Sequence, residues 1–144
     1  MSTSQPLGVQ IVFLTYLNRS GSTYLAGKLN SYDTVKMGIE ARFVDGWTRP
    51  GFSVNNPEEL SLYLDNLYQD DKFQAWDIPK KKLATQLAAL EFPLRFTDIL
   101  QAALLLYQGK STHQFFIHKC GEYYRCVNEI RKELPGAKFI FINR

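Results

Sequence analysis

The sequence is poor in cysteine and lacks the ligand pattern of a metal or disulfide protein. Cys120 and Cys126 are the only two cysteines in the 144 residues, and five residues separate them. A pair at this spacing without companion ligands fits neither a zinc site nor a disulfide framework. We therefore predict reduced thiols, no bound metal and a cytoplasmic location.

Long hydrophobic runs are absent as well. The apolar segment at residues 9–17 is interrupted by Gln10 and Thr15, and it is much shorter than the ~20 residues that a membrane-spanning helix needs. The N-terminus shows no basic stretch followed by a long apolar one, as a secretory signal would. We expect no membrane segment.

A strong charge of one sign is also missing. The net charge is +3, and no basic stripe of the kind that follows a nucleic-acid backbone is visible. This argues against nucleic acid as a partner and leaves room for a small anionic ligand. The hydrophobic content of 45% predicts a globular chain that is long enough for one domain with a core.

A short loop at residues 19–23 has the elements of an anion site. It follows an apolar strand candidate at residues 9–16 and opens a helix candidate at residues 22–29. Backbone N–H groups at a helix start attract anions, and Gly21 lets the main chain approach a ligand closely. Hydroxyl donors from Ser22 and Thr23 and the guanidinium of Arg19 would add to this attraction, and Ser20 is also predicted to bind the ligand.

The loop nevertheless lacks the features of a nucleotide triphosphate site. The usual phosphate loop has a Lys after its last glycine, whereas here Arg19 precedes Gly21. No carboxylate that could hold magnesium stands at the end of an apolar strand. A phosphate-bearing ligand that needs no metal is therefore the better prediction, with an ordinary strand–helix turn as the alternative.

Strand and helix candidates alternate along the chain. Further strands are predicted at residues 34–37, 115–118 and 138–142, and a helix at residues 122–134. This pattern predicts a three-layer, P-loop-like α/β fold with a parallel sheet and helices on both faces. A helical insertion is expected in the middle: Asn56 would cap one helix, and two more would be broken near Pro93.

In a parallel sheet, ligands bind outside the carboxyl ends of the strands. The loop at residues 19–23, Glu40, Lys119 and Arg144 all fall at such ends. No helix follows the last strand to cover it. We therefore expect the chain to be a truncated piece of a longer domain, or to be completed by another subunit.

Two of these segments resemble signatures of the sulfotransferases. The RSGST loop at residues 19–23 resembles their 5′-phosphosulfate loop, here taken as residues 17–24. The segment LPGAKFIFINR at residues 134–144 resembles their second signature, in which a strand (138–144) leads to an arginine for the 3′-phosphate. The middle of the chain, at about residues 45–112, shows little similarity and would be a variable acceptor region.

The resemblance is closest to the branch that includes tyrosylprotein sulfotransferases and many bacterial relatives. In that branch a G-x-E-x-R segment, GIEAR at residues 38–42, carries the catalytic base, which would be Glu40. A strand ending in lysine, here Lys119, supplies a cation near the transferred group. Cys120 and Gly121 follow this lysine where the family commonly has a proline, and the turn and serine that usually follow the final arginine are absent.

The resemblance implies transfer of a sulfuryl group from 3′-phosphoadenosine 5′-phosphosulfate (PAPS) to a hydroxyl acceptor without a metal. Arg19 and Lys119 would stabilise charge together with the loop amides, and Glu40 would be the general base. Arg42 would hold Glu40 ionised or orient the acceptor, and Arg144 would bind the 3′-phosphate.

The sequence does not identify the acceptor, which could be a small molecule, a carbohydrate, a lipid or a peptide tyrosine. The chain could form a homodimer. Two other functions remain open: a nucleotide-binding, P-loop kinase-like protein and a non-catalytic α/β anion-binding module. His118 is predicted to be a hydrogen-bonded strand residue and not a base. Tyr123 and Tyr124 are predicted to pack within a helix.

Overall fold

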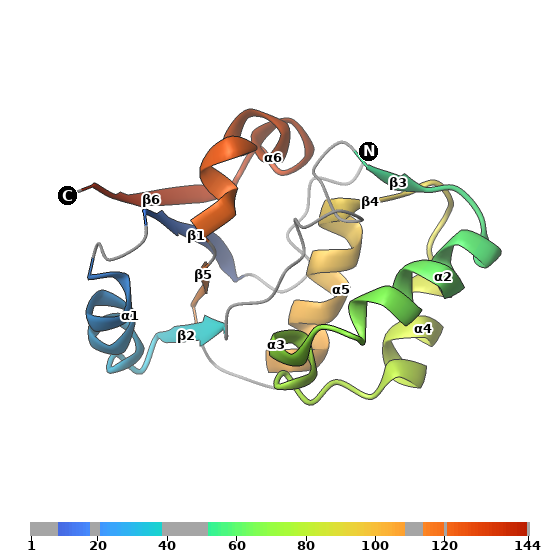
Figure 1. The fold of residues 1–144 in the computed structure, drawn as a ribbon, viewed down its shortest axis with the longest axis horizontal. Helices are drawn as coiled ribbons and strands as arrows, with labels where there is room; N and C mark the ends of the chain where they lie inside the picture. Colours follow the sequence, from blue (N-terminus) through green and yellow to red (C-terminus); the bar gives the residue numbers. More distant parts are fainter. Residues whose placement is uncertain (1–8, 18–20, 39–51, 109–113, 120, 144) are drawn as a thin grey trace. The chain divides into compact units, whose positions relative to one another are not determined.

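The computed structural model describes residues 9–17, 21–38, 52–108, 114–119 and 121–143 of the chain. The chain forms two compact units (Figure 1). Unit 1 comprises Met1–Glu40 and Lys110–Arg144, and unit 2 comprises Ala41–Gly109.

Unit 1 is built on a four-stranded parallel sheet. Its strands are β1 (Gln10–Tyr16), β2 (Val35–Gly38), β5 (Phe115–Lys119) and β6 (Lys138–Ile142), in the order β2-β5-β1-β6. The central strand β1 has five consecutive buried residues, as expected for a strand that is covered on both faces. The prediction of an α/β fold with a parallel sheet is confirmed.

The two faces of the sheet have different covers, because successive side chains of a strand point to opposite sides. Val12, Leu14 and Ile117 form a buried cluster on one face, against which Leu25 and Leu29 of helix α1 (Ser22–Asn30) pack.

The other face carries Phe13, whose ring lies edge-on to Tyr123 at 4.9 Å and stacks on Phe139 at 5.4 Å. Tyr123 belongs to the 3₁₀ helix η1 (Gly121–Arg125), which leads into α6 (Val127–Glu133). Figure 1 shows α1 and α6 on opposite sides of the strands.

In unit 1, the chain leaves the two neighbouring strands β1 and β5 toward opposite edges of the sheet. The chain leaves β1 through α1 and reaches β2 at one edge of the sheet, whereas β5 is followed by η1 and α6 and leads to β6 at the other edge. Strands β1 and β5 are adjacent and parallel. Their carboxyl ends therefore form a switch point, which is where ligands bind in open α/β sheets.

Unit 2 consists mainly of helices. These are α2 (Pro57–Leu67), α3 (Asp71–Gln74), α4 (Lys80–Ala88) and α5 (Phe96–Gln108), together with a two-stranded antiparallel pair, β3 (Ser53–Val54) and β4 (Leu94–Arg95). Leu64, Leu83, Leu87 and Ile99 are among its buried core residues. The prediction of a helical middle segment is confirmed.

Several details differ from the sequence-based predictions. The expected helix at residues 122–134 is divided into η1 and α6, because the first residues after β5 turn back onto the end of β1. The short strands β3 and β4, which pair with each other before α5 begins, were not predicted. Helix α3 was not predicted. None of the helices in the described ranges is both long and apolar enough to cross a membrane.

Candidate functional site

Gly21 begins the candidate site, because it turns the chain into α1. Its φ of 83° and ψ of 14° lie in the left-handed region, which favours glycine. The carbonyl oxygen of Gly21 accepts the first helical hydrogen bond, from the Leu25 amide at 3.1 Å. The helix geometry leaves the amides of Ser22 and Thr23 without an acceptor inside α1.

The start of α1 carries the partial positive charge of its free backbone N–H groups, with no acidic side chain in its first turn. None of the described residues caps it with a side chain. A Cβ atom built on Gly21 would have no heavy atom of the described residues within 4 Å, apart from those of its chain neighbours. Amides without an acceptor inside the helix and the positive end of the helix dipole together favour an anion, although Ser22 itself is buried.

Lys119 brings a full charge to the same place. Leu14 of β1 pairs with Lys119 at the end of β5. Alternation puts Lys119 on the same face as Ile117, which is the face covered by α1. Its Nζ donates a long hydrogen bond of 3.4 Å to Thr23 Oγ1 and lies 5.1 Å from the centroid of the Tyr16 ring. The ammonium therefore stands at the open end of α1.

The turn after β5 is fixed to the end of β1. The Thr15 hydroxyl donates a hydrogen bond of 3.0 Å to the carbonyl oxygen of Gly121. A Cβ atom at Gly121 would lie 3.2 Å from the Tyr16 carbonyl oxygen, so a larger residue here would push the two segments apart. These contacts hold the main chain at Gly121, two residues after Lys119. They therefore limit how far the Cα atom of Lys119 can move.

His118 lies on the opposite face of β5 from Lys119. It is fully buried, and its Nδ1 is hydrogen-bonded to the Tyr123 hydroxyl at 2.7 Å. Burial lowers the pKa of His118 from 6.5 to about 3, so the ring is neutral at physiological pH. The prediction that His118 is a hydrogen-bonded strand residue is confirmed. Tyr123 packs in the core as predicted, whereas the exposed Tyr124 does not.

The structure brings together four of the predicted site residues: Gly21, Ser22, Thr23 and Lys119. The other five lie outside the described residues, and their roles stay predictions: Arg19, Ser20, Glu40, Arg42 and Arg144.

Tyr16 joins the site without having been predicted. It ends β1 two positions after Leu14, on the face that α1 covers. Its part in the site follows from the pairing of β1 with β5, which the sequence did not reveal.

Neither comparison with known proteins identifies a relative. No protein-family profile matches the chain, and a search of curated proteins finds no match. In the described part of the chain, no group of three or more His, Cys, Asp or Glu side chains could hold a metal ion. The chemistry of the site has to be argued from its own residues.

Proposed function

We propose that this protein is a sulfotransferase, which moves a sulfuryl group from PAPS to a hydroxyl acceptor. One observation carries the proposal: the ammonium of Lys119 stands 3.4 Å from Thr23 Oγ1 at the uncapped start of α1. Strand β5 and helix α1 thus bring a cation and helix-start amides together near the switch point of the sheet. The resemblance of the loop and of the last strand to sulfotransferase signatures supplies the identity of the anion.

The residues present fit an anionic sulfate or phosphate ester. The open main chain at Gly21 allows close approach, and the Ser22 and Thr23 amides and the Thr23 hydroxyl can donate hydrogen bonds. PAPS would supply an activated sulfuryl group. Lys119 and these donors would stabilise the charge that builds on the transferred and leaving oxygens, and losing one such donor typically lowers the rate by about 10²–10³.

The order of the strands supports the remaining assignments. Gly38, the last residue of β2, pairs with His118, and Glu40 follows two positions later. Ile142 pairs with Tyr16, and Arg144 follows it in the same way. Strands β2 and β6 thus end at the same edge of the sheet as Lys119, and Glu40 and Arg144 each follow such an end by a few positions in the sequence.

On this proposal Glu40 takes the proton of the acceptor hydroxyl. Arg42 holds Glu40 ionised or orients the acceptor. Arg19 contacts the sulfuryl end of PAPS with Ser20, and Arg144 binds its 3′-phosphate. Unit 2 would supply the acceptor region, for a small molecule, a carbohydrate or a lipid. The cytoplasmic location and the homodimer remain predictions.

The test is acceptor-dependent release of 3′-phosphoadenosine 5′-phosphate (PAP) from PAPS, measured with small alcohols, sugars, lipid alcohols and tyrosine peptides. The wild type should release PAP with at least one acceptor class, and Glu40→Gln should lower the rate by about 10²–10⁴. Glu129→Gln serves as the control, because Glu129 is an exposed residue of α6 in unit 1, outside the proposed acceptor region.

The other outcomes separate the competing functions. PAP binding without release in any acceptor class would favour a non-catalytic anion-binding module. Magnesium-dependent binding of ATP in place of PAP would favour the kinase-like alternative. Release that is unchanged in Glu40→Gln would remove Glu40 as the base.

A further inference from the structure

We infer that Tyr16 is a positioning residue, whose ring holds the ammonium of Lys119 at the start of α1 with its hydrogen-bond donors available to an anion. The inference rests on the proposed function for its consequence in the reaction. The contact between the two side chains is a property of the chain itself and can be tested without any ligand.

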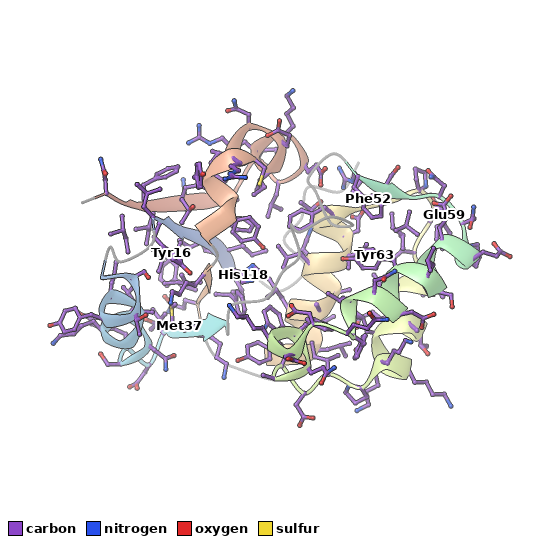
Figure 2. All side chains as sticks on the ribbon, in the orientation of Figure 1. Tyr16, Met37, Phe52, Glu59, Tyr63 and His118 are labelled. Atoms are coloured by element: carbon purple, nitrogen blue, oxygen red, sulfur yellow. The ribbon has the colours of Figure 1, made fainter. Side chains whose placement is uncertain are left out.

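The two side chains meet because of the strand register. Tyr16 and Lys119 end two adjacent parallel strands and share the face that α1 covers. Lys119 Nζ lies 5.1 Å from the centroid of the Tyr16 ring, within the ~6 Å over which an aromatic face attracts a cation. Figure 2 labels the half-buried Tyr16 at the end of β1, near α1.

An ammonium needs such support at this place. The N-terminal end of a helix carries partial positive charge, which opposes a second cation. The lysine stem is also flexible, and holding it in one conformation costs side-chain entropy. A carboxylate partner would fix the ammonium but would cancel its charge. An aromatic face attracts the cation and leaves the net charge of the site intact for an anionic ligand.

The ring is itself held in place from the other side. A Cβ atom on Gly121 would lie 3.5 Å from Tyr16 Cε2 and 3.2 Å from the Tyr16 carbonyl oxygen. The main chain of η1 therefore begins directly against Tyr16. The hydrogen bond from Thr15 to the Gly121 carbonyl oxygen ties the same two segments together. The ring thus lies against the main chain at Gly121 as well as near the Lys119 ammonium.

The contact is tested by NMR on the chain with its lysines reductively methylated with ¹³C. The Lys119 signal is assigned by its loss in Lys119→Gln. Ring currents should shift this signal upfield in the wild type and in Tyr16→Phe, and the shift should disappear in Tyr16→Leu. Tyr32→Leu is the control, because Tyr32 is 62% exposed beyond the far end of α1. A Lys119 signal at the same position in the wild type and in Tyr16→Leu would overturn the inference.

The consequence for the reaction is tested by calorimetric titration with PAP. Tyr16→Leu should weaken binding about two- to fivefold, the range expected for an exposed cation–π contact, and Tyr16→Phe should restore it. In a Lys119→Gln background the Tyr16→Leu change should have no further effect, because Tyr16 acts through Lys119.

A purely structural role would instead lower the affinity equally in both backgrounds, and that result would overturn the positioning role. If the wild type fails to bind PAP while the upfield shift is present, the proposed function is wrong and the side-chain contact stands.

Discussion

Lys119 Nζ and Thr23 Oγ1 lie 3.4 Å apart, although 96 positions of the sequence separate the two residues. The link exists because β1 and β5 are adjacent in the sheet and α1 follows β1 directly. It places a full positive charge at the start of a helix whose first amides have no acceptor inside the helix and whose first turn has no acidic residue. The predictions below test this arrangement and the packing that supports it.

Replacing Gly21 with alanine should destabilise unit 1. A residue with a Cβ atom in the left-handed region costs about 1–2 kcal/mol, and Gly21 has a φ of 83°. Gly27→Ala is the matched control and should change the stability in the opposite direction, because Gly27 lies inside α1 and a Cβ atom there has space. That change should stabilise the helix by up to ~1 kcal/mol. Urea unfolding followed by far-ultraviolet circular dichroism measures both, and a neutral Gly21→Ala would contradict the turn geometry.

Tyr123→Phe should also lower the stability of unit 1. The change removes the buried hydrogen bond of 2.7 Å to His118 Nδ1, and an interior polar group that loses its partner costs about 1–3 kcal/mol. Faster hydrogen exchange of the β1 amides would report this loss. Tyr124→Phe is the control, since Tyr124 is exposed. Equal exchange rates in the two variants would show that the hydrogen bond contributes nothing.

Stability should fall as the pH falls below 6.5, because of His118. Burial lowers the pKa of His118 from 6.5 to about 3, so between these values the unfolded chain binds a proton that the folded chain excludes. The free energy of unfolding then decreases with falling pH by at most about 1.4 kcal/mol per pH unit. Unfolding curves between pH 6.5 and about pH 5, above the range in which most carboxyl groups titrate, measure this slope.

The double variant His118→Leu/Tyr123→Phe is the control for the pH slope, because it replaces both hydrogen-bonding partners with apolar groups. Its slope in this pH range should be smaller than that of the wild type. A slope equal to that of the wild type would show that His118 does not carry the effect.

Asn56→Ala should destabilise unit 2 by about 1 kcal/mol. The Asn56 side chain accepts a hydrogen bond of 2.9 Å from the Glu59 amide, and the Glu59 carboxylate accepts one of 2.8 Å from the Asn55 amide. Both tryptophans, Trp47 and Trp76, belong to unit 2, so their fluorescence follows its unfolding.

Asn66→Ala is the control for the helix cap, since Asn66 stands near the end of the same helix. It should leave the urea midpoint almost unchanged. A midpoint that moves equally in both variants would contradict a specific role for the cap.

The sequence predicted the parts of the fold that depend on local patterns. The β1 and β6 strands stand out as apolar β-rich runs, and the observed β6 coincides with the predicted residues 138–142. The start of α2 was predicted from Asn56, and the structure confirms Asn56 as its cap. These features depend on backbone chemistry and capping, which a few neighbouring residues determine.

The remaining features depend on contacts between distant segments. The division of the helix at residues 122–134 follows from the approach of Gly121 to the end of β1. The short strands β3 and β4 exist only through their pairing with each other. The role of Tyr16 depends on the register between β1 and β5, which a strand pattern cannot specify by itself.

Calorimetric titration with PAP tests the central claim most directly, with the wild type compared with Lys119→Gln. A charge-assisted hydrogen bond contributes about 1.5–3 kcal/mol, so the affinity of Lys119→Gln should fall by roughly 10- to 150-fold. Lys138→Gln changes the net charge equally at the opposite end of a parallel strand and should bind as the wild type does. Equal affinities of the wild type and Lys119→Gln, or a wild type that does not bind PAP, would contradict an anion site at this edge of the sheet.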